Sequence, residues 1–295
     1  MKIVMLGTGT PAPSLERQCS GYLIDTGQDV IVMDHGYGAH HRLLEAGYRP
    51  TDVTHVFLSH VHYDHIGDYP RLIMQHWDIG AGKTAELNVF GPHPIERLTQ
   101  AIIGPDGFLG PDIDARLNHQ ASKDVFVSRG GELPRKPPQP DIREIAPGDV
   151  VEGQGWKIRV GEASHVQPFM ECLAFRLESE EGVVVYSGDS GGAPQSMIDL
   201  AKDCDILIHM CHFPTGLEPT AEYRRATGNH MDVAEIAAKA EVKCLVLTHM
   251  IPLLDRPVVK ERMLFDISRV YRGPVILGED LMEIPLKVKY PHIVD

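Results

Sequence analysis

The chain has 295 residues, of which 43% are hydrophobic and 23% charged, as in ordinary soluble globular proteins with a large core. Its formal net charge of −13 disfavours a long polyanion as a partner, because no local cluster of basic residues offsets the repulsion. The five cysteines form no CxxC pair or disulfide framework, and no apolar run is long enough to span a bilayer. We therefore expect reduced thiols, no signal peptide, a cytoplasmic location and no membrane association.

The first part of the chain predicts three β-strands followed by a helix. Short β-prone runs occupy residues 2–6, 21–25 and 30–34, and the turn between the last two contains a glycine that suits a hairpin. The first run ends in the stretch 7–11, Gly-Thr-Gly-Thr-Pro, which lacks the lysine of a P-loop and precedes no clear helix. We interpret this stretch as a tight loop at the rim of a site rather than as a dinucleotide-binding turn. Helical spacing follows over residues 39–46.

The next predicted strand, residues 53–59, leads into a hexapeptide that is dense in metal ligands. Residues 60–65 read His-Val-His-Tyr-Asp-His, and imidazole and carboxylate groups are good ligands for zinc and similar metals. No cysteine pair accompanies them, which excludes a zinc finger. Gly67 and the β-branched run before the hexapeptide indicate a strand that enters a tight loop, which argues against a helical His-x-x-x-His site.

The spacing within the hexapeptide predicts two metal positions. If the loop curls back on itself, His60 and His62 point to one centre, and Asp64 and His65 point to another. A surface cluster formed by chance is the alternative, because the chain has 16 histidines. The ordered pattern directly after an apolar strand favours the metal site.

Asp34 ends the third predicted strand, just before His35 and Gly36. A carboxylate at this position could orient a metal-binding histidine from behind. Capping of the helix that follows is an equally good interpretation.

The middle of the chain becomes irregular after a predicted strand at residues 87–90 and a helix at residues 95–103. The segment 104–140 is rich in glycine and proline, and a loop of this length in a compact domain commonly shapes a pocket or an oligomer contact. We expect a loop-rich insertion that acts as a lid or a dimer arm. No composition shift marks a boundary, so we expect one domain over residues 1–295.

Three further candidate ligands follow predicted strands in the second half of the chain. One strand precedes His165, and the second strand of a hairpin, residues 182–186, runs into Asp189 on a glycine-flanked turn. Residues 244–248 form a strand of the buried type, and His249 follows directly. Because sites in α/β sheets assemble at the carboxyl ends of strands, we expect these side chains to converge.

The ordered candidate ligands resemble those of the metallo-β-lactamase superfamily, and the stretches 7–11 and 34–36 resemble that family's first two strand motifs. The resemblance implies an α/β fold with four αββα layers and a dinuclear site at one edge of the two sheets. It also implies two Zn²⁺ ions, with Mn²⁺ or iron as alternatives that accept the same ligand types. The first metal would be held by His60, His62 and His165, and the second by Asp64, His65 and His249, with Asp189 bridging.

The same resemblance implies a metal-dependent hydrolase. Two cations that share a water lower its pKa, so a metal-bridging hydroxide attacks the substrate and no serine or cysteine nucleophile is needed. Asp64 would serve catalysis through the second cation, which stabilises the developing oxyanion or leaving group. His230, which precedes an alanine-rich helix, is a candidate acid for the leaving group, and a structural role at the start of that helix is the alternative.

Residues 205–209 and 228–230 resemble the branch that holds ribonuclease Z and the metallo-β-lactamase-type arylsulfatases. In the tRNA-processing enzymes a glutamate follows the histidine equivalent to His209, whereas this chain has Met210 and no evident basic tRNA-binding arm. We therefore expect a small-molecule substrate, namely an ester, lactone, amide or sulfate or phosphate ester, and no nucleic acid. The alternative enzyme is a ribonuclease Z-like phosphodiesterase or endoribonuclease. From another class, the alternatives are a mononuclear iron dioxygenase and a non-catalytic metal-binding member.

A homodimer is the default expectation for the oligomeric state. Apolar residues close to the ligands or within the segment 104–140 are candidates for an apolar substrate pocket, with core packing as the alternative. They are Tyr63, Phe108, Phe169, Met170, Met250 and Leu254.

Overall fold

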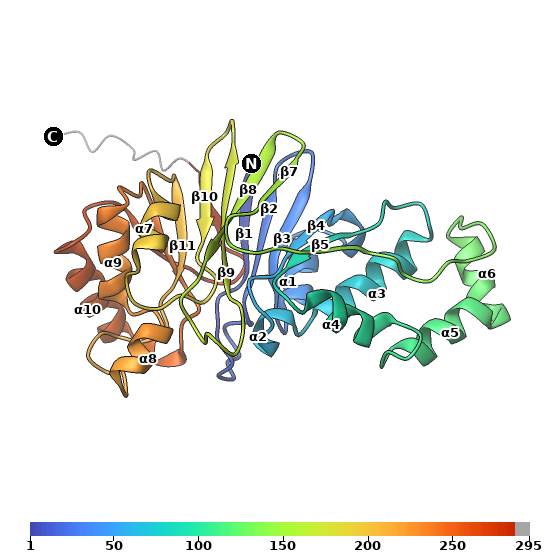
Figure 1. The fold of residues 1–295 in the computed structure, drawn as a ribbon, viewed down its shortest axis with the longest axis horizontal. Helices are drawn as coiled ribbons and strands as arrows, with labels where there is room; N and C mark the ends of the chain where they lie inside the picture. Colours follow the sequence, from blue (N-terminus) through green and yellow to red (C-terminus); the bar gives the residue numbers. More distant parts are fainter. Residues whose placement is uncertain (287–295) are drawn as a thin grey trace.

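The computed structural model describes residues 1–286 and has two seven-stranded sheets that are stacked face to face (Figure 1). Helices cover the outer face of each sheet, which confirms the predicted four-layer αββα architecture. The first sheet has the strand order β14-β1-β2-β3-β4-β5-β6, with β1 (Lys2–Gly7), β2 (Gly21–Asp25), β3 (Val30–His35), β4 (His55–Phe57), β5 (Asn88–Gly91), β6 (Asp141–Glu144) and β14 (Glu283–Ile284).

The second sheet has the order β13-β12-β11-β10-β9-β8-β7. Its strands are β7 (Val150–Gly153), β8 (Trp156–Glu162), β9 (Leu173–Ser179), β10 (Val183–Tyr186), β11 (Ile206–Met210), β12 (Leu245–Thr248) and β13 (Val275–Leu277). The strands β10 to β13 are parallel to one another, as are β3 to β6 in the first sheet. Each sheet therefore presents several strand carboxyl ends along one edge.

The main core lies between the two sheets and consists of the inward-facing side chains of alternate residues. Tyr22 of β2 contacts Tyr186 of β10, with ring centroids 4.5 Å apart, and Phe57 of β4 packs against Phe175 of β9 at 5.6 Å. The alternate residues of the same strands face the helices, as Leu23 of β2 does. Because both faces of each sheet are covered, the central strands are apolar along almost their whole length.

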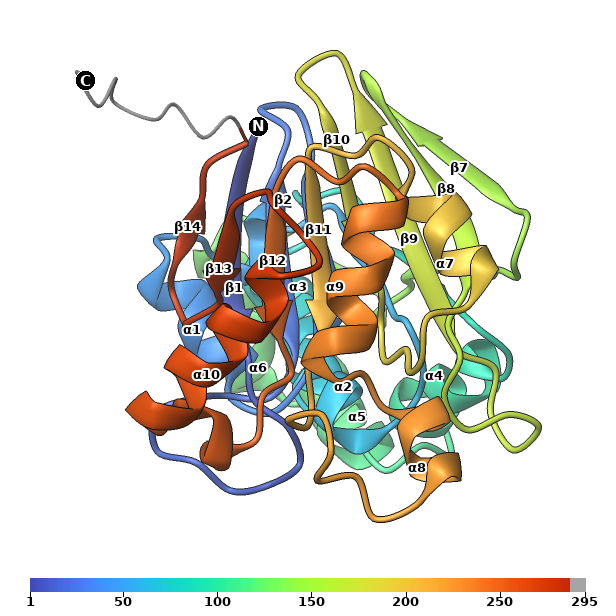
Figure 2. The same ribbon diagram turned by 90° about the vertical axis from the view of Figure 1, so that its left-hand side faces the viewer.

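Helices α1 (Ala39–Glu45), α3 (Tyr69–Gly80) and α4 (Ile95–Ile103) pack on the first sheet. Figure 2 shows α7 (Gln195–Ala201), α9 (His230–Lys239) and α10 (Pro257–Ser268) on the outer face of the second sheet. The one-turn helix α2 (Tyr63–Ile66) and the short helix α8 (Ala221–Ala226) lie at the same edge of the molecule in both views. Two 3₁₀ helices complete the elements, η1 (Pro50–Asp52) and η2 (Pro252–Asp255).

The segment 104–140, which we expected to be rich in loops, combines loops with helices. It contains two helices, α5 (Gly110–Asn118) and α6 (Gln120–Ser128). The glycines and prolines lie before α5, in its first turn and in the loop 129–140 after α6. Pro111 occupies a first-turn position of α5, where its missing N–H costs nothing. The terminal residues of the helices thus resemble a loop sequence although the interiors are helical.

The segment 104–140 extends beyond α3, away from α2, and does not lie over that edge of the sheets (Figure 1). Asp78 at the end of α3 anchors it, because its carboxylate pairs with Arg116, Arg129 and Arg135. The guanidinium of Arg135 also stacks on the Trp77 ring at 3.9 Å. Within residues 1–286 no helix is long and apolar enough to cross a membrane.

Candidate metal centre

The hexapeptide is positioned by strand β4, which ends at Phe57 and directs the chain into the edge where the parallel strands finish. His60 and His62 lie in the extended segment after this strand, whereas Asp64 and His65 lie on the one-turn helix α2. A side chain at Gly36 would collide with the backbone of Asp64, so glycine is required there for the close approach of the two segments. The local fold thus separates the hexapeptide into two pairs of ligands.

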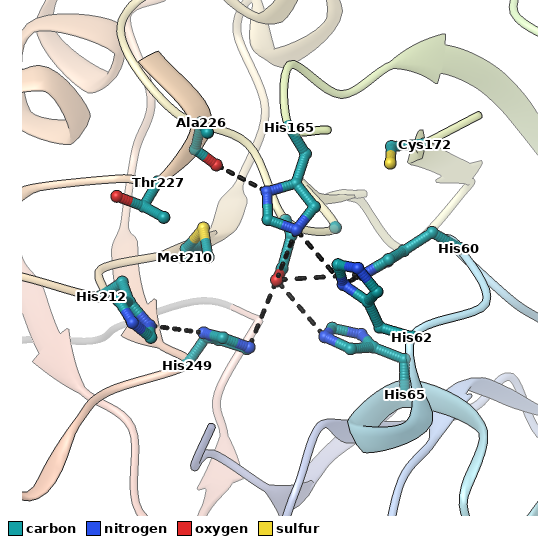
Figure 3. Close-up of polar contacts among 12 residues, drawn as sticks. His60, His62, His65, His165, Cys172, Met210, His212, Ala226, Thr227 and His249 are labelled. Carbon is teal, nitrogen blue, oxygen red and sulfur yellow. Dashed lines mark hydrogen bonds and ion pairs between the residues drawn. The ribbon is translucent and has the colours of Figure 1, made fainter. Parts of the chain in front are cut away.

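All seven predicted ligands are brought together at this edge. His60, His62, His165 and Asp189 each offer one ligand atom within 4.8 Å of the others, and Asp64, His65 and His249 do the same. In the first group, Nδ1 of His62 lies 2.9 Å from Nε2 of His60 and 3.3 Å from Nε2 of His165. In the second group, Nε2 of His249 lies 3.2 Å from Oδ2 of Asp64. Figure 3 shows the five ligand histidines gathered around one centre.

Asp189 lies between the two groups. Its Oδ2 is 3.6 Å from Nε2 of His165 and 3.3 Å from Nε2 of His249, and its Oδ1 is 3.4 Å from Nε2 of His65. The turn after β10 that carries it contains Gly188 in the left-handed region, at φ 53°. A carboxylate in this position can contact ligands, and hence cations, on both sides.

Behind the ligands, the ring nitrogen that faces away from the centre has its own partner in four of the five ligand histidines. Nδ1 of His60 lies 2.9 Å from Oγ of Ser59, and Nδ1 of His165 lies 2.6 Å from the backbone oxygen of Ala226. The other two pairs are His65 Nδ1 with Asp34 Oδ2 at 2.8 Å and His249 Nδ1 with His212 Nδ1 at 3.2 Å. Such partners fix the ring orientation and tautomer of a metal-binding histidine.

Asp34 acts behind the site and does not cap the following helix. Its carboxylate accepts hydrogen bonds from the backbone N–H and hydroxyl of Ser59, both at 2.7 Å, and from the hydroxyl of Tyr186 at 2.6 Å. The N-cap of α1 is Gly38. Asp34 also has φ 56°, an uncommon backbone conformation for a residue with a side chain. These bonds hold the strained residue in the place where it orients His65.

The electrostatics of the site favour a cation. Burial lowers the pKa of His60 well below its usual value, so its imidazole keeps a free lone pair. Burial alone would raise the pKa of Asp189, but the neighbouring His249 and His65 hold it well below its usual value. Burial likewise opposes a charge on His65, yet the carboxylates of Asp189 and Asp34 raise its pKa well above the usual value. The carboxylates that favour a proton on His65 would equally favour a metal cation in its place, and imidazoles beside ionised carboxylates are the donor set that zinc and similar metals take.

Two buried polar atoms at the centre form no hydrogen bond, Nε2 of His65 and Oδ1 of Asp189. Buried polar groups almost always have a partner, so unpaired atoms that face each other at 3.4 Å require an explanation. A cation between these groups would satisfy both atoms at once. The residues present therefore fit the two-metal site that the sequence predicted.

His230, the candidate acid, lies at the start of α9 and makes its contacts elsewhere. Its Nδ1 accepts a hydrogen bond from the backbone N–H of Thr215 at 3.1 Å, and its Nε2 lies 3.8 Å from Asp266. Among the contacts described for residues 1–286, none joins His230 to a metal ligand. The helix is capped by Asn229, whose side chain accepts from Met231 and Asp232, so His230 is not the cap either.

The candidate pocket residues separate into two groups. Tyr63 is 58% exposed and adjoins the ligands in the chain, and Phe169 is 93% exposed and lies four residues after His165. Met250 and Leu254 are buried in the core between the second sheet and its helices, where Met170 also packs. Phe108 is exposed in the segment 104–140. Of this set, Tyr63 and Phe169 are the residues whose exposure and position suit contact with a substrate.

Sequence reasoning missed three of the groups behind the ligands, namely the hydroxyl of Ser59, the imidazole of His212 and the backbone oxygen of Ala226. His212 follows strand β11 at the same edge, and burial lowers the pKa of its ring to about 4. The rule that strand ends carry ligands could have identified it, because it stands two residues after Met210. Ala226 could not have been found, since a backbone oxygen leaves no signature in the sequence.

The αββα fold and the paired ligand groups at the sheet edge are those of a metal-dependent hydrolase. The family model of the metallo-beta-lactamase superfamily matches residues 15–249. The chain belongs to this superfamily.

Among curated proteins, the chain is 28% identical to "Ribonuclease Z" of Mycolicibacterium paratuberculosis over 303 residues, which cover 96% of this chain and 98% of the relative. Among solved structures, it is similar to the metallo-beta-lactamase fold protein YhfI from Bacillus subtilis, with a TM-score of 0.72, 21% identity and coverage of 96% and 98%. The short form of human tRNase Z superposes with a TM-score of 0.68 at 18% identity, covering 98% of this chain and 100% of that one. These two structural likenesses support the fold.

Proposed function

We propose that this chain is a two-metal phosphodiesterase that hydrolyses P–O bonds. The observation that carries the proposal is the position of Asp189, whose two carboxylate oxygens reach ligand histidines of both groups. A carboxylate between two cations is the arrangement that enzymes use for displacement at phosphorus. The curated relatives named "Ribonuclease Z" support this reaction class over the wider set of esters, lactones, amides and sulfates.

Two divalent cations bound here would supply an acidified water and polarise a phosphoryl oxygen of the substrate. The chain's own residues set the geometry for that chemistry. Asp64 and His249 hold one side of the centre, and His60, His62 and His165 hold the other. Asp34 and Ser59 prevent the ligand rings from turning, so the site is organised before the substrate arrives.

The cysteines near the site are poor candidates for a nucleophile. Burial raises the pKa of Cys19 to about 11 and that of Cys172 to about 12, so both remain thiols at neutral pH. A thiol is a much weaker nucleophile than a thiolate. This agrees with a reaction in which water attacks the substrate directly.

RNA is the first candidate substrate class, which reverses our expectation that nucleic acid is excluded. The curated relatives match this chain over 96% of its length, and their name states an action on RNA. A small phosphodiester is the second candidate, and two observations favour it. The net charge is −13, and the segment 104–140 carries as many acidic as basic side chains, so this segment is not a basic arm. Met210 also stands where the tRNA-processing enzymes have a glutamate.

The test is a hydrolysis panel with zinc-reconstituted protein, using a precursor tRNA with a 3′ extension, bis(p-nitrophenyl) phosphate, an aryl sulfate and a lactone. Cleavage of both phosphodiesters supports the proposal with RNA as substrate, and cleavage of bis(p-nitrophenyl) phosphate alone supports the second candidate. Turnover of the sulfate or lactone without phosphodiester cleavage would overturn it. A parallel series with chelator checks the metal requirement.

We further propose two Zn²⁺ ions as the native metals, with Mn²⁺ or iron as the alternatives, because the ligands are imidazole and carboxylate groups.

The five cysteines are free thiols, which agrees with a cytoplasmic location. A homodimer is proposed as the assembly, with the segment 104–140 as the contact, since this segment does not cover the site. Metal analysis and sedimentation of the purified chain test these points.

A further inference from the structure

The outward-facing nitrogens of the ligand histidines reveal a role for a residue that is not itself a ligand. Behind His60, His165 and His65 stand a hydroxyl, a backbone carbonyl and a carboxylate, which are ordinary hydrogen-bond acceptors. Behind His249 stands another imidazole, that of His212, with the two Nδ1 atoms 3.2 Å apart. Among the described residues, His249 is therefore the one ligand whose outer partner can exist in two tautomers.

The tautomers of His249 and His212 follow from which nitrogen of His249 would face a cation. Nε2 of His249 faces the carboxylates of Asp64 and Asp189, at 3.2 and 3.3 Å, so it is the nitrogen that would face a cation. An imidazole that gives its Nε2 lone pair to a cation carries its proton on Nδ1. That N–H then donates to Nδ1 of His212, which must be unprotonated and act as the acceptor.

We propose that His212 is a positioning residue for the metal centre, which accepts the Nδ1–H bond of His249 and thereby holds this ligand in its metal-binding tautomer and orientation. The inference rests on the proposed two-metal site but not on the identity of the substrate. The His212 ring supplies behind His249 the hydrogen-bond acceptor that a hydroxyl, a carbonyl or a carboxylate supplies behind the other ligands.

Two further features of the surroundings support this role. His249 has φ 54°, an uncommon conformation for a residue with a side chain, so its position depends on contacts that hold it. The His212 ring in turn is fixed by aromatic neighbours, with ring centroids 5.3 Å from Phe213 and 6.2 Å from Tyr223. Figure 3 shows His212 behind His249, on the side away from the other ligands. A restrained acceptor behind a strained ligand is what a positioning role requires.

The test compares His212→Asn with His212→Leu, because an asparagine Oδ1 can occupy the place of Nδ1 and accept the same hydrogen bond. The readout is the affinity of the second Zn²⁺ ion, measured by competition with a chromogenic chelator on the full chain. We expect His212→Leu to weaken this affinity about 10–100-fold, and His212→Asn to stay within about threefold of the wild type. His76→Leu, a buried histidine on α3, controls for the loss of an imidazole elsewhere.

Nitrogen-15 spectra of the zinc-loaded protein provide a second measurement, which should show His212 protonated at Nε2 alone and His249 at Nδ1. Wild-type zinc affinity in His212→Leu, an equal defect in His212→Asn, or a proton on Nδ1 of His212 would each overturn the inference. Failure of the proposed function has a different signature, namely two tightly bound zinc ions without phosphodiester cleavage. If the metal-free His212→Leu protein is unstable, the melting temperatures of the metal-free variants will reveal the instability. The nitrogen-15 spectra of the wild type then decide whether His212 accepts the hydrogen bond from His249.

Discussion

Asp189 is the residue on which the two halves of the metal centre depend. It is the carboxylate that approaches His65, His165 and His249 together, at 3.3 to 3.6 Å. Its buried charge is tolerated because imidazoles surround it, and cations would compensate it more fully. The other acidic groups at the centre, Asp34 and Asp64, each serve one side.

We therefore expect Asp189→Ala to lose both bound cations and to lower turnover by more than about 100-fold, because each ligand group loses a shared carboxylate. Metal content by plasma mass spectrometry and the rate with bis(p-nitrophenyl) phosphate are the measurements. Asp199→Ala on α7, where the exposed carboxylate accepts a hydrogen bond from Gln195, is the control. Two retained cations with full turnover would show that Asp189 does not bridge.

For His230 the structure leads to the opposite expectation. Its ring contacts Thr215 and Asp266 rather than a ligand, so His230→Asn should leave the metal content unchanged and turnover within about threefold of the wild type. A loss of turnover of 100-fold or more with both cations retained would contradict this expectation. That result would restore His230 as the acid for the leaving group.

At the scale of elements, partly exposed charged groups join the neighbouring strands β8 and β9 of the second sheet. Glu178 on β9 lies 2.8 Å from Arg176, 3.1 Å from Lys157 and 3.3 Å from Arg159. Burial raises the pKa of Glu178, but the hydrogen bonds from Arg176 and Lys157 outweigh it and lower the pKa from 4.5 to about 2. This carboxylate thus ties β8 to β9 mainly in its ionised form.

The lowered pKa predicts an acid-dependent loss of stability. The unfolded chain binds the proton more tightly than the folded one, so the stabilisation is complete above pH 4.5 and disappears as the pH falls toward 2. Between pH 7 and pH 3 we expect the wild type to lose about 1–2 kcal/mol more unfolding free energy than Glu178→Gln, since solvent screens part of the interaction. Urea unfolding at both pH values measures the difference. Equal losses in the two proteins would contradict it, and Glu180→Gln is the exposed control.

At the scale of the whole molecule, the metal centre lies where the two sheets meet and joins loops from both. The first sheet contributes His60, His62, Asp64 and His65, and the second contributes Asp189 and His249 at the ends of β10 and β12. Cations bound here would connect the two halves of the αββα sandwich. Their removal would leave the buried carboxylates of Asp64 and Asp189 with imidazoles as their only compensation among the described residues.

Chelation should therefore lower thermal stability as well as activity. A cation present at 100 times its dissociation constant stabilises the fold by about 2.7 kcal/mol, which corresponds to about 4 °C for a chain of this size. We expect EDTA to lower the melting temperature by at least that amount and added Zn²⁺ to restore it. Scanning calorimetry with and without chelator is the measurement, and an unchanged melting temperature would contradict cations that span the two sheets.

Much of the fold could be predicted from local patterns. The apolar runs at β1, β2, β3, β11 and β12 match strands of the structure because each is buried on both faces, and such burial leaves a continuous apolar signature. Helices α5 and α6 escaped prediction because their ends are rich in glycine and proline. Met250 and Leu254, which were candidates for a substrate pocket, are buried in the core. Closeness in sequence to a ligand does not determine the direction of a side chain.

The hexapeptide and the three strand-end residues are visible in the sequence because metal ligation needs particular side chains, and the strand that precedes each ligand marks its place. The groups behind the ligands are different, since any acceptor suffices there and a hydroxyl, a carbonyl, a carboxylate and an imidazole are all used. The pairing of His212 with His249, 37 residues apart, exists only because parallel strands β11 and β12 deliver the two rings side by side. Chemistry at the centre is therefore encoded locally, whereas its support depends on the tertiary structure.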